Sequence, residues 1–263
     1  MVVKKMKSKN IIVVQNVFDD LSKTAQSIES IRFASHRWEC DFYEISYFKH
    51  KDSLSTLFWD RIWAMENFEN FDKVLIVDPD VIINEEAPNI FDMMEPTTDL
   101  CVVHNINRDR VSTPYFENIS LKISKLHNSI DIFKRKINNF SETTYLENYF
   151  NMGVFLYRPK SLSPIIQEMK EMIFNDEELM KYLSFKETGD WFPAQNFTSA
   201  YLTHSNLNVK FLSKEWNWLC PDIDTECNEE YFWGKMKPNI YHFTGTNLSK
   251  ERLKTYTNWK KNG

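Results

Sequence analysis

Glycine is scarce in this sequence, which has 263 residues and only 5 glycines. Neither of the glycine-rich loops that bind phosphate, GxGxxG and GxxxxGK[ST], is present. If the protein binds a nucleotide, other groups must therefore hold its phosphates. Cysteine is also rare: the 4 cysteines show no CxxC spacing and are too few for a disulfide framework.

The sequence has no long apolar run and no basic stripe. No segment is apolar over enough residues for a signal peptide or a membrane span, so we expect a cytoplasmic protein without a transmembrane segment. The formal net charge is -5, and charges of both signs are spread along the chain. Nucleic acid is therefore not an expected partner. The length suits one large domain, and we expect a single domain over residues 1–263.

The most informative stretch present is FDKVLIVDPDVII, residues 71–83. Its apolar residues 74–77 predict a strand buried on both faces, as in parallel sheets, and they lead directly into Asp78-Pro79-Asp80. Pro79 has no N–H for a sheet ladder and so marks the end of the strand. Ligands of α/β proteins bind at the carboxyl ends of strands, and paired carboxylates there suit a divalent cation. A D-x-D triplet alone is a weak signal, because loop carboxylates are common.

The order of the remaining segments predicts an α/β fold with a mostly parallel sheet flanked by helices. Further strands are predicted at residues 11–14, 41–45, 100–103, 150–157, 209–212 and 239–245, and helices at 22–33, 53–67, 88–94, 121–133, 164–174 and from residue 193. Residues 105–148 are polar and without a clear pattern. In a compact domain we expect such a stretch to form an insert or lid on the acceptor side of the site.

Arg61 lies on the apolar stripe of the predicted helix 53–67, directly before the strand that ends in Asp78. A guanidinium on a buried face needs an anionic partner, because an unpaired buried charge is costly. Two interpretations remain open. Arg61 either pairs with a carboxylate of the protein or contacts a phosphate or sugar near Asp78.

Two later stretches carry polar groups where ligands could approach. Asn151 and Gly153 open an apolar run, and a glycine there lets another group come close to the backbone. Gln195 falls in the first turn of the helix that begins at Pro193, where polar side chains can point into a cleft. A short predicted strand near the end carries His242.

Together these stretches resemble the GT-A-fold glycosyltransferases of family 8, the group that includes glycogenin and lipopolysaccharide galactosyltransferases. The matching segments are an Arg61-bearing helix before KVLIVDPD (residues 73–80), the N-x-G stretch at 151–156, the active-site helix around Gln195 and the H-F-x-G segment at 242–245. The resemblance implies a GT-A fold and a retaining transfer from a nucleotide-sugar, a UDP-sugar, to a glycan, lipid-linked sugar or protein acceptor. It also implies a metal cofactor, Mn²⁺ or Mg²⁺, with Asp78, Asp80 and His242 as its ligands.

The resemblance also assigns roles to other residues. Donor-binding residues would be Asn16, Asp19, Arg61, Asp78, Asn151, Gly153, Gly245 and Lys250, and catalytic residues would be Gln195 and Asp190. Both acids that flank the glutamine in the family are missing, because this chain has Ala194 and Asn196 there. Asp190 is the nearby acid that we assign to the lost sugar contact.

Two other functions fit part of the same pattern. A relative that binds a sugar or nucleotide with little catalysis would keep the fold and lose the metal ligands, yet Asp78, Asp80 and His242 are all present. A phosphatase of the haloacid dehalogenase type also uses a strand that ends in D-x-D. It usually has Thr or Val two residues after the second Asp, where this chain has Ile82.

Overall fold

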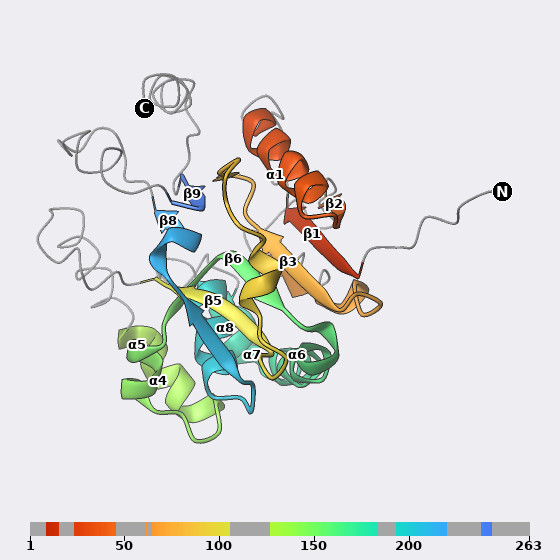
Figure 1. Ribbon diagram of the computed structural model, residues 1–263. Helices are drawn as coiled ribbons and strands as arrows, with labels where there is room; N and C mark the ends of the chain where they lie inside the picture. The colour runs from red at the N-terminus through yellow and green to blue at the C-terminus, as the bar shows by residue number, and fades with distance from the viewer. Residues whose placement is uncertain are drawn as a thin grey trace, which may run out of the picture.

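The computed structural model describes residues 9–15, 24–45, 61–62, 65–105, 127–183, 193–219 and 238–243. At its centre is a six-stranded sheet of order β2-β1-β3-β6-β5-β7 (Figure 1). These strands are β1 (Asn10–Gln15), β2 (Asp41–Ile45), β3 (Lys73–Val77), β5 (Leu100–His104), β6 (Phe150–Tyr157) and β7 (Val209–Leu212). A second, three-stranded sheet of order β4-β9-β8 consists of β4 (Val81–Ile83), β9 (Ile240–His242) and β8 (Trp218–Leu219).

Helices cover both faces of the central sheet. The helix α1 (Ala25–Arg37) lies on one face, and α6 (Pro159–Phe174), α7 (Glu177–Leu183) and α8 (Pro193–Thr203) lie on the other (Figure 1). The helices α4 (His127–Lys136) and α5 (Glu142–Glu147) join the second group, and short 3₁₀ turns form η2 (Ile90–Met93) and η4 (Lys214–Trp216). None of the helices in the described ranges is both long and apolar enough to cross a bilayer.

The strand residues alternate between two hydrophobic clusters. In β1, Ile11 and Val13 belong to the cluster that contains α6–α8, whereas Ile12 and Val14 belong to the cluster that contains α1. Successive side chains of a strand point to opposite faces, so a strand covered on both sides must be apolar throughout. This confirms the sequence prediction of an α/β fold with doubly buried strands.

One strand of the central sheet runs against the other five. Strand β6 is antiparallel to both of its neighbours, β3 and β5, whereas β1 pairs in parallel with β2 and β3, and β5 pairs in parallel with β7. The amino end of β6 therefore lies at the edge where the neighbouring strands end. This reversal brings Asn151 and Gly153 to the same edge as Asp78.

Most of the predicted strands agree with the structure, but the strand expected at residues 239–245 is confined to Ile240–His242 among the described residues, β4 and β8 were not predicted, and the helix boundaries need correction. The helix expected at residues 22–33 continues to Arg37, and the helix expected at 164–174 begins at Pro159, a favourable first position, with Pro164 inside it. Of the predicted helix 53–67, residues 61–62 and 65–67 are described and helical. Residues 127–148 contain α4 and α5, and Phe133 and Tyr145 are fully buried in edge-to-face contact, so this part of the expected insert belongs to the core.

Candidate active site

Asp78 and Asp80 occupy the turn that links the two sheets. Asp78 extends the ladder between β3 and β6 by one residue, since its backbone N–H donates to the carbonyl of Gly153 at 3.0 Å. Strand β4 begins directly after Asp80, and the carbonyl of Asp80 accepts the N–H of Phe243 at 2.9 Å. The end of one buried strand and the start of another thus fix the positions of both acids.

The small sheet places His242 beside these acids. In the pairing of β9 with β4, His242 lies opposite Val81, the residue after Asp80. In the pairing with β8, His242 lies opposite Leu219, two residues after Asn217. Because β9 is the central strand of this sheet, the imidazole is held from both sides and is only 3% exposed.

Three metal-ligating groups converge at this point. His242 Nε2 lies 3.5 Å from Asp78 Oδ2 and 3.3 Å from Asp80 Oδ1, and one ligand atom from each residue lies within 4.8 Å of the others. Among the described residues, none donates a hydrogen bond to the buried Asp80 Oδ1. A buried carboxylate oxygen without a partner is costly, and a cation between these three groups would remove that cost.

Gly153 is required by the position of the imidazole. A Cβ built on Gly153 would lie 2.6 Å from His242 Nδ1 and 2.8 Å from Asn151 Oδ1, closer than atoms can approach. A close approach to the backbone is what the sequence predicts here, and the approaching group is His242. Any larger residue would push the ring away from the two acids.

Arg61 pairs with Asp78 and also donates to the carbonyl of Met152. The guanidinium is mostly buried, and burial lowers the pKa of Arg61 to about 10, while the negative charge of Asp80 limits the shift. Of the two interpretations left open by the sequence, pairing with a protein carboxylate is the one that the structure contains. Through this pair, the helical segment that contains Arg61 is connected to Asp78 at the end of β3.

Asn151, on β6, and Gln195, on α8, are in contact with each other. Asn151 Nδ2 donates to Gln195 Oε1 at 3.3 Å, and the backbone N–H of Met152 donates to the same oxygen at 3.1 Å. Gln195 Nε2 in turn donates to the hydroxyl of Tyr149 at 2.8 Å. The first turn of α8 is thereby joined to the start of β6.

The structure thus brings seven of the predicted site residues together: Arg61, Asp78, Asp80, Asn151, Gly153, Gln195 and His242. The other five, Asn16, Asp19, Asp190, Gly245 and Lys250, lie outside the described residues, as does the predicted helix that follows Ser249.

The sequence analysis missed Asn217. Its side chain is 4% exposed, accepts from His242 Nδ1 at 2.8 Å and donates to Asn151 Oδ1 at 2.8 Å. The available signal was an Asn between two Trp residues, Trp216 and Trp218, in the segment that follows the predicted strand 209–212. Polar residues in such a place are candidates for the edge of the sheet where ligands bind.

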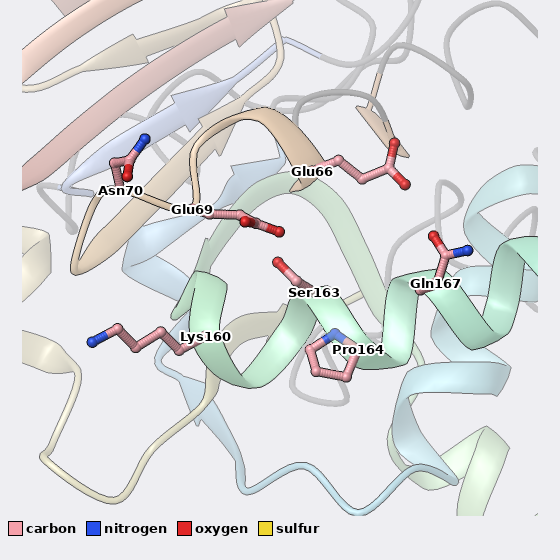
Figure 2. Close-up of a pocket in the computed structure, with 7 residues that line it drawn as sticks. All are labelled: Glu66, Glu69, Asn70, Lys160, Ser163, Pro164 and Gln167. Carbon is pink, nitrogen blue, oxygen red and sulfur yellow. The ribbon is translucent and has the colours of Figure 1, made fainter.

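Figure 2 shows a surface pocket that lies apart from these residues. It is lined by Glu66, Glu69 and Asn70 on one side and by α6 residues, among them Lys160 and Ser163, on the other. Residues 66–70 precede β3, so the pocket lies toward the amino end of that strand, whereas Asp78 follows its carboxyl end. The pocket contains none of the converging groups.

Comparison with known proteins decides the family. Residues 4–248 match the family model described as glycosyl transferase family 8. The chain belongs to glycosyl transferase family 8. It is therefore a glycosyltransferase, and this assignment favours sugar transfer over the phosphatase alternative. A search of curated proteins gives no significant match.

Solved structures show the same GT-A fold at low sequence identity. The galactosyltransferase LgtC, in complex with donor and acceptor sugar analogues, has a TM-score of 0.53 at 12% identity, covering 96% of this chain and 95% of that chain. A glycosyltransferase involved in glycosylation of the major capsid of PBCV-1 has a TM-score of 0.51 at 13% identity, covering 96% and 98%. The apo form of GlyE from Streptococcus pneumoniae TIGR4 has a TM-score of 0.52 at 12% identity, covering 96% and 60%.

Proposed function

We propose that the protein transfers a sugar from a UDP-sugar to an acceptor hydroxyl, with the help of a divalent cation and with retention of the anomeric configuration. The observation that carries this proposal is the convergence of Asp78, Asp80 and His242 at the carboxyl edge of the sheet. In α/β folds this edge is where ligands bind.

The donor set fits Mn²⁺, with Mg²⁺ as the alternative. Two carboxylates and one imidazole suit a borderline ion, whereas Mg²⁺ prefers oxygen ligands alone. Asp78, Asp80 and His242 would hold the ion. When bound, it would neutralise charge on the departing diphosphate, which is the task that a glycine-rich loop would otherwise share.

Retention is supported by the chemistry of Gln195. An inverting transferase needs a carboxylate base near the acceptor hydroxyl, and an amide cannot accept that proton. The amide oxygen of Gln195 accepts hydrogen bonds from the backbone N–H of Met152 and from the side chain of Asn151. These two bonds hold the side chain in place. In a retaining front-face reaction the acceptor oxygen bonds to the anomeric carbon, the bond to the phosphate oxygen breaks, and the leaving phosphate takes the acceptor proton.

The remaining donor contacts follow from the family. Arg61, Asp78, Asn151 and Gly153 border the converging groups, and Asn16, Asp19, Gly245 and Lys250 would complete the donor site. Asp190 would make the sugar contact of the two family acids that are replaced here by Ala194 and Asn196. The acceptor would be a glycan, a lipid-linked sugar or a protein, bound by one domain that spans residues 1–263 and uses part of residues 105–148.

The test is a panel of nucleotide-sugars incubated with Mn²⁺, with hydrolysis measured in the absence of acceptor. We expect one UDP-sugar to be hydrolysed and EDTA to stop the reaction. Proton NMR of the fresh product should show the anomeric configuration of the donor. An inverted product would contradict retention and point to Asp190 as a base. Binding of a nucleotide-sugar without any turnover would instead favour the alternative of a catalytically weak relative.

A further inference from the structure

A continuous chain of hydrogen bonds runs from the candidate metal ligand to the first turn of α8. In order, the side chains are His242, Asn217, Asn151, Gln195, Tyr149 and Asn196, with separations of 2.8, 2.8, 3.3, 2.8 and 2.7 Å. Each of the first three is at least nine-tenths buried. Buried amides of this kind must satisfy their donors and acceptors within the protein.

Two backbone groups fix the orientation of the amides in this chain. The N–H of Gly153 donates to the side chain of Asn151 at 2.7 Å, and the N–H of Met152 donates to the side chain of Gln195 at 3.1 Å. A backbone N–H can only donate, so each amide atom that it contacts must be the oxygen. The other terminal atom of each amide is therefore its NH₂ group.

The orientation then propagates to the imidazole. Because Asn151 presents its oxygen to Asn217, the group of Asn217 that makes this contact must be its NH₂. The oxygen of Asn217 is thus left for His242 Nδ1, and an amide oxygen can only accept. His242 Nδ1 must consequently carry a hydrogen.

This proton assignment determines which nitrogen can bind a metal. In a neutral imidazole with hydrogen on Nδ1, Nε2 carries the free lone pair. His242 Nε2 is the nitrogen that lies 3.5 Å from Asp78 Oδ2 and 3.3 Å from Asp80 Oδ1. The chain therefore presents a lone pair to the point where the carboxylates converge.

We propose that Asn217 is a positioning residue that holds His242 in the Nδ1–H tautomer and so directs its Nε2 lone pair at the metal site. The part of this proposal that concerns metal binding rests on the proposed function. The tautomer of His242 follows from the hydrogen bonds alone. Second-sphere acceptors of this kind orient ligating histidines, and their loss typically weakens metal binding about 10- to 100-fold. The same chain couples the ring to Gln195 through Asn151.

The tautomer can be measured without any metal by long-range ¹H–¹⁵N NMR of the histidine side chains. We expect His242 of the wild-type protein to carry hydrogen on Nδ1. A ring with hydrogen on Nε2 and none on Nδ1 would overturn the proposal, and this result needs no variant that must fold.

Variants then separate positioning from general packing. Asn217→Leu removes the acceptor at similar volume and should shift His242 toward the Nε2–H tautomer, whereas Asn217→Asp keeps an acceptor and should retain Nδ1–H. The matched control is Asn196→Leu. It removes the buried amide at the far end of the chain, where the backbone contacts to Asn151 and Gln195 still fix the orientation. Its His242 tautomer should be that of the wild type.

Affinity for Mn²⁺ alone, measured by EPR of the free ion, completes the test. We expect Asn217→Leu to bind Mn²⁺ about 10- to 100-fold more weakly and Asn196→Leu to bind it like the wild type. If the wild type binds no Mn²⁺ but Asn217→Leu changes the tautomer of His242, the proposed metal site is wrong. The positioning of the His242 ring by Asn217 is then still supported. If Asn217→Leu leaves both the tautomer and the affinity unchanged, the positioning role is wrong.

Discussion

Two histidine regions of this protein use the same anchoring contact for different purposes. In the helical region, His204 Nδ1 lies 2.7 Å from the carbonyl of Ala200, and the ring stacks on Phe140 with centroids 4.8 Å apart. Its Nε2 accepts the backbone N–H of Ser141 at 2.9 Å. At the sheet edge, His242 Nδ1 is anchored by Asn217, but its Nε2 faces two carboxylates.

The difference separates a structural histidine from a ligating one. For His204 the protein supplies a donor to the second nitrogen, which uses up its lone pair and joins α8 to the start of α5. For His242 the second nitrogen faces two carboxylate acceptors, and no donor among the described residues is recorded there, an arrangement that becomes favourable when a cation enters. The nature of the group that faces Nε2 distinguishes the two rings.

The largest effect is expected when one of those acceptors is removed. In Asp80→Ala, turnover should fall by on the order of 10³-fold, because a bound metal ion contributes several kcal/mol of charge stabilisation. The melting temperature of the metal-free protein should fall only slightly, because the lost buried oxygen has no hydrogen-bond donor among the described residues, although the charge of Asp80 favours the charged form of Arg61. Sugar-transfer assays and thermal melts with and without Mn²⁺ measure both effects.

The exposed acid Asp92, on η2, provides the control for this substitution. Asp92→Ala should keep wild-type turnover and Mn²⁺ dependence. If Asp80→Ala retained full Mn²⁺-dependent turnover, the carboxylates beside His242 would not form a metal site. His242 would then not differ from His204 in function.

An intermediate effect is expected when the ring of His242 is displaced and both carboxylates remain. The added methyl of Gly153→Ala would overlap His242 Cε1 and Nδ1, so the ring must move away from the acids. We expect Mn²⁺ affinity to fall about 10- to 100-fold and stability to fall by about 1–3 kcal/mol. Metal titration and chemical denaturation provide the two measurements.

Val154→Ala, at the next position of β6, is the matched control for Gly153→Ala. Val154 is fully buried in the cluster on the α1 side, so its truncation lowers stability through lost burial without adding an atom near His242. Its Mn²⁺ affinity should match the wild type. Equal weakening of the metal in both variants would mean that general loosening of the sheet, not the position of the ring, controls affinity.

The sequence predicted the parts of this site that depend on local pattern. The β-branched run before Asp78 identified a buried strand, and a break at Pro79 placed two acids at its end. The family resemblance added His242. The pairing of Arg61 with Asp78 remained one of two alternatives, because the sequence does not say which anion a buried guanidinium meets.

The remaining features depend on contacts between distant segments. Asn217 and Asn151 are 66 positions apart and meet only because β8 and the start of β6 reach the same edge. The reversed direction of β6 also gives no local signal, since a doubly buried strand is apolar in either orientation. The boundaries of α6 were wrong for a different reason, as Pro164 looks like a helix start but lies inside a helix that Pro159 begins.

The smallest effect on function is expected for the structural histidine. His204→Leu leaves the backbone N–H of Ser141 without its acceptor and removes the bond to the carbonyl of Ala200. The loss of stability should be about 1–3 kcal/mol, which corresponds to roughly 2–4 °C of melting temperature per kcal/mol. Affinity for Mn²⁺ and the tautomer of His242 should not change, because His204 belongs to a separate set of contacts. A weaker metal site in His204→Leu would show that the two histidine regions are coupled through α8, whose first turn carries Gln195.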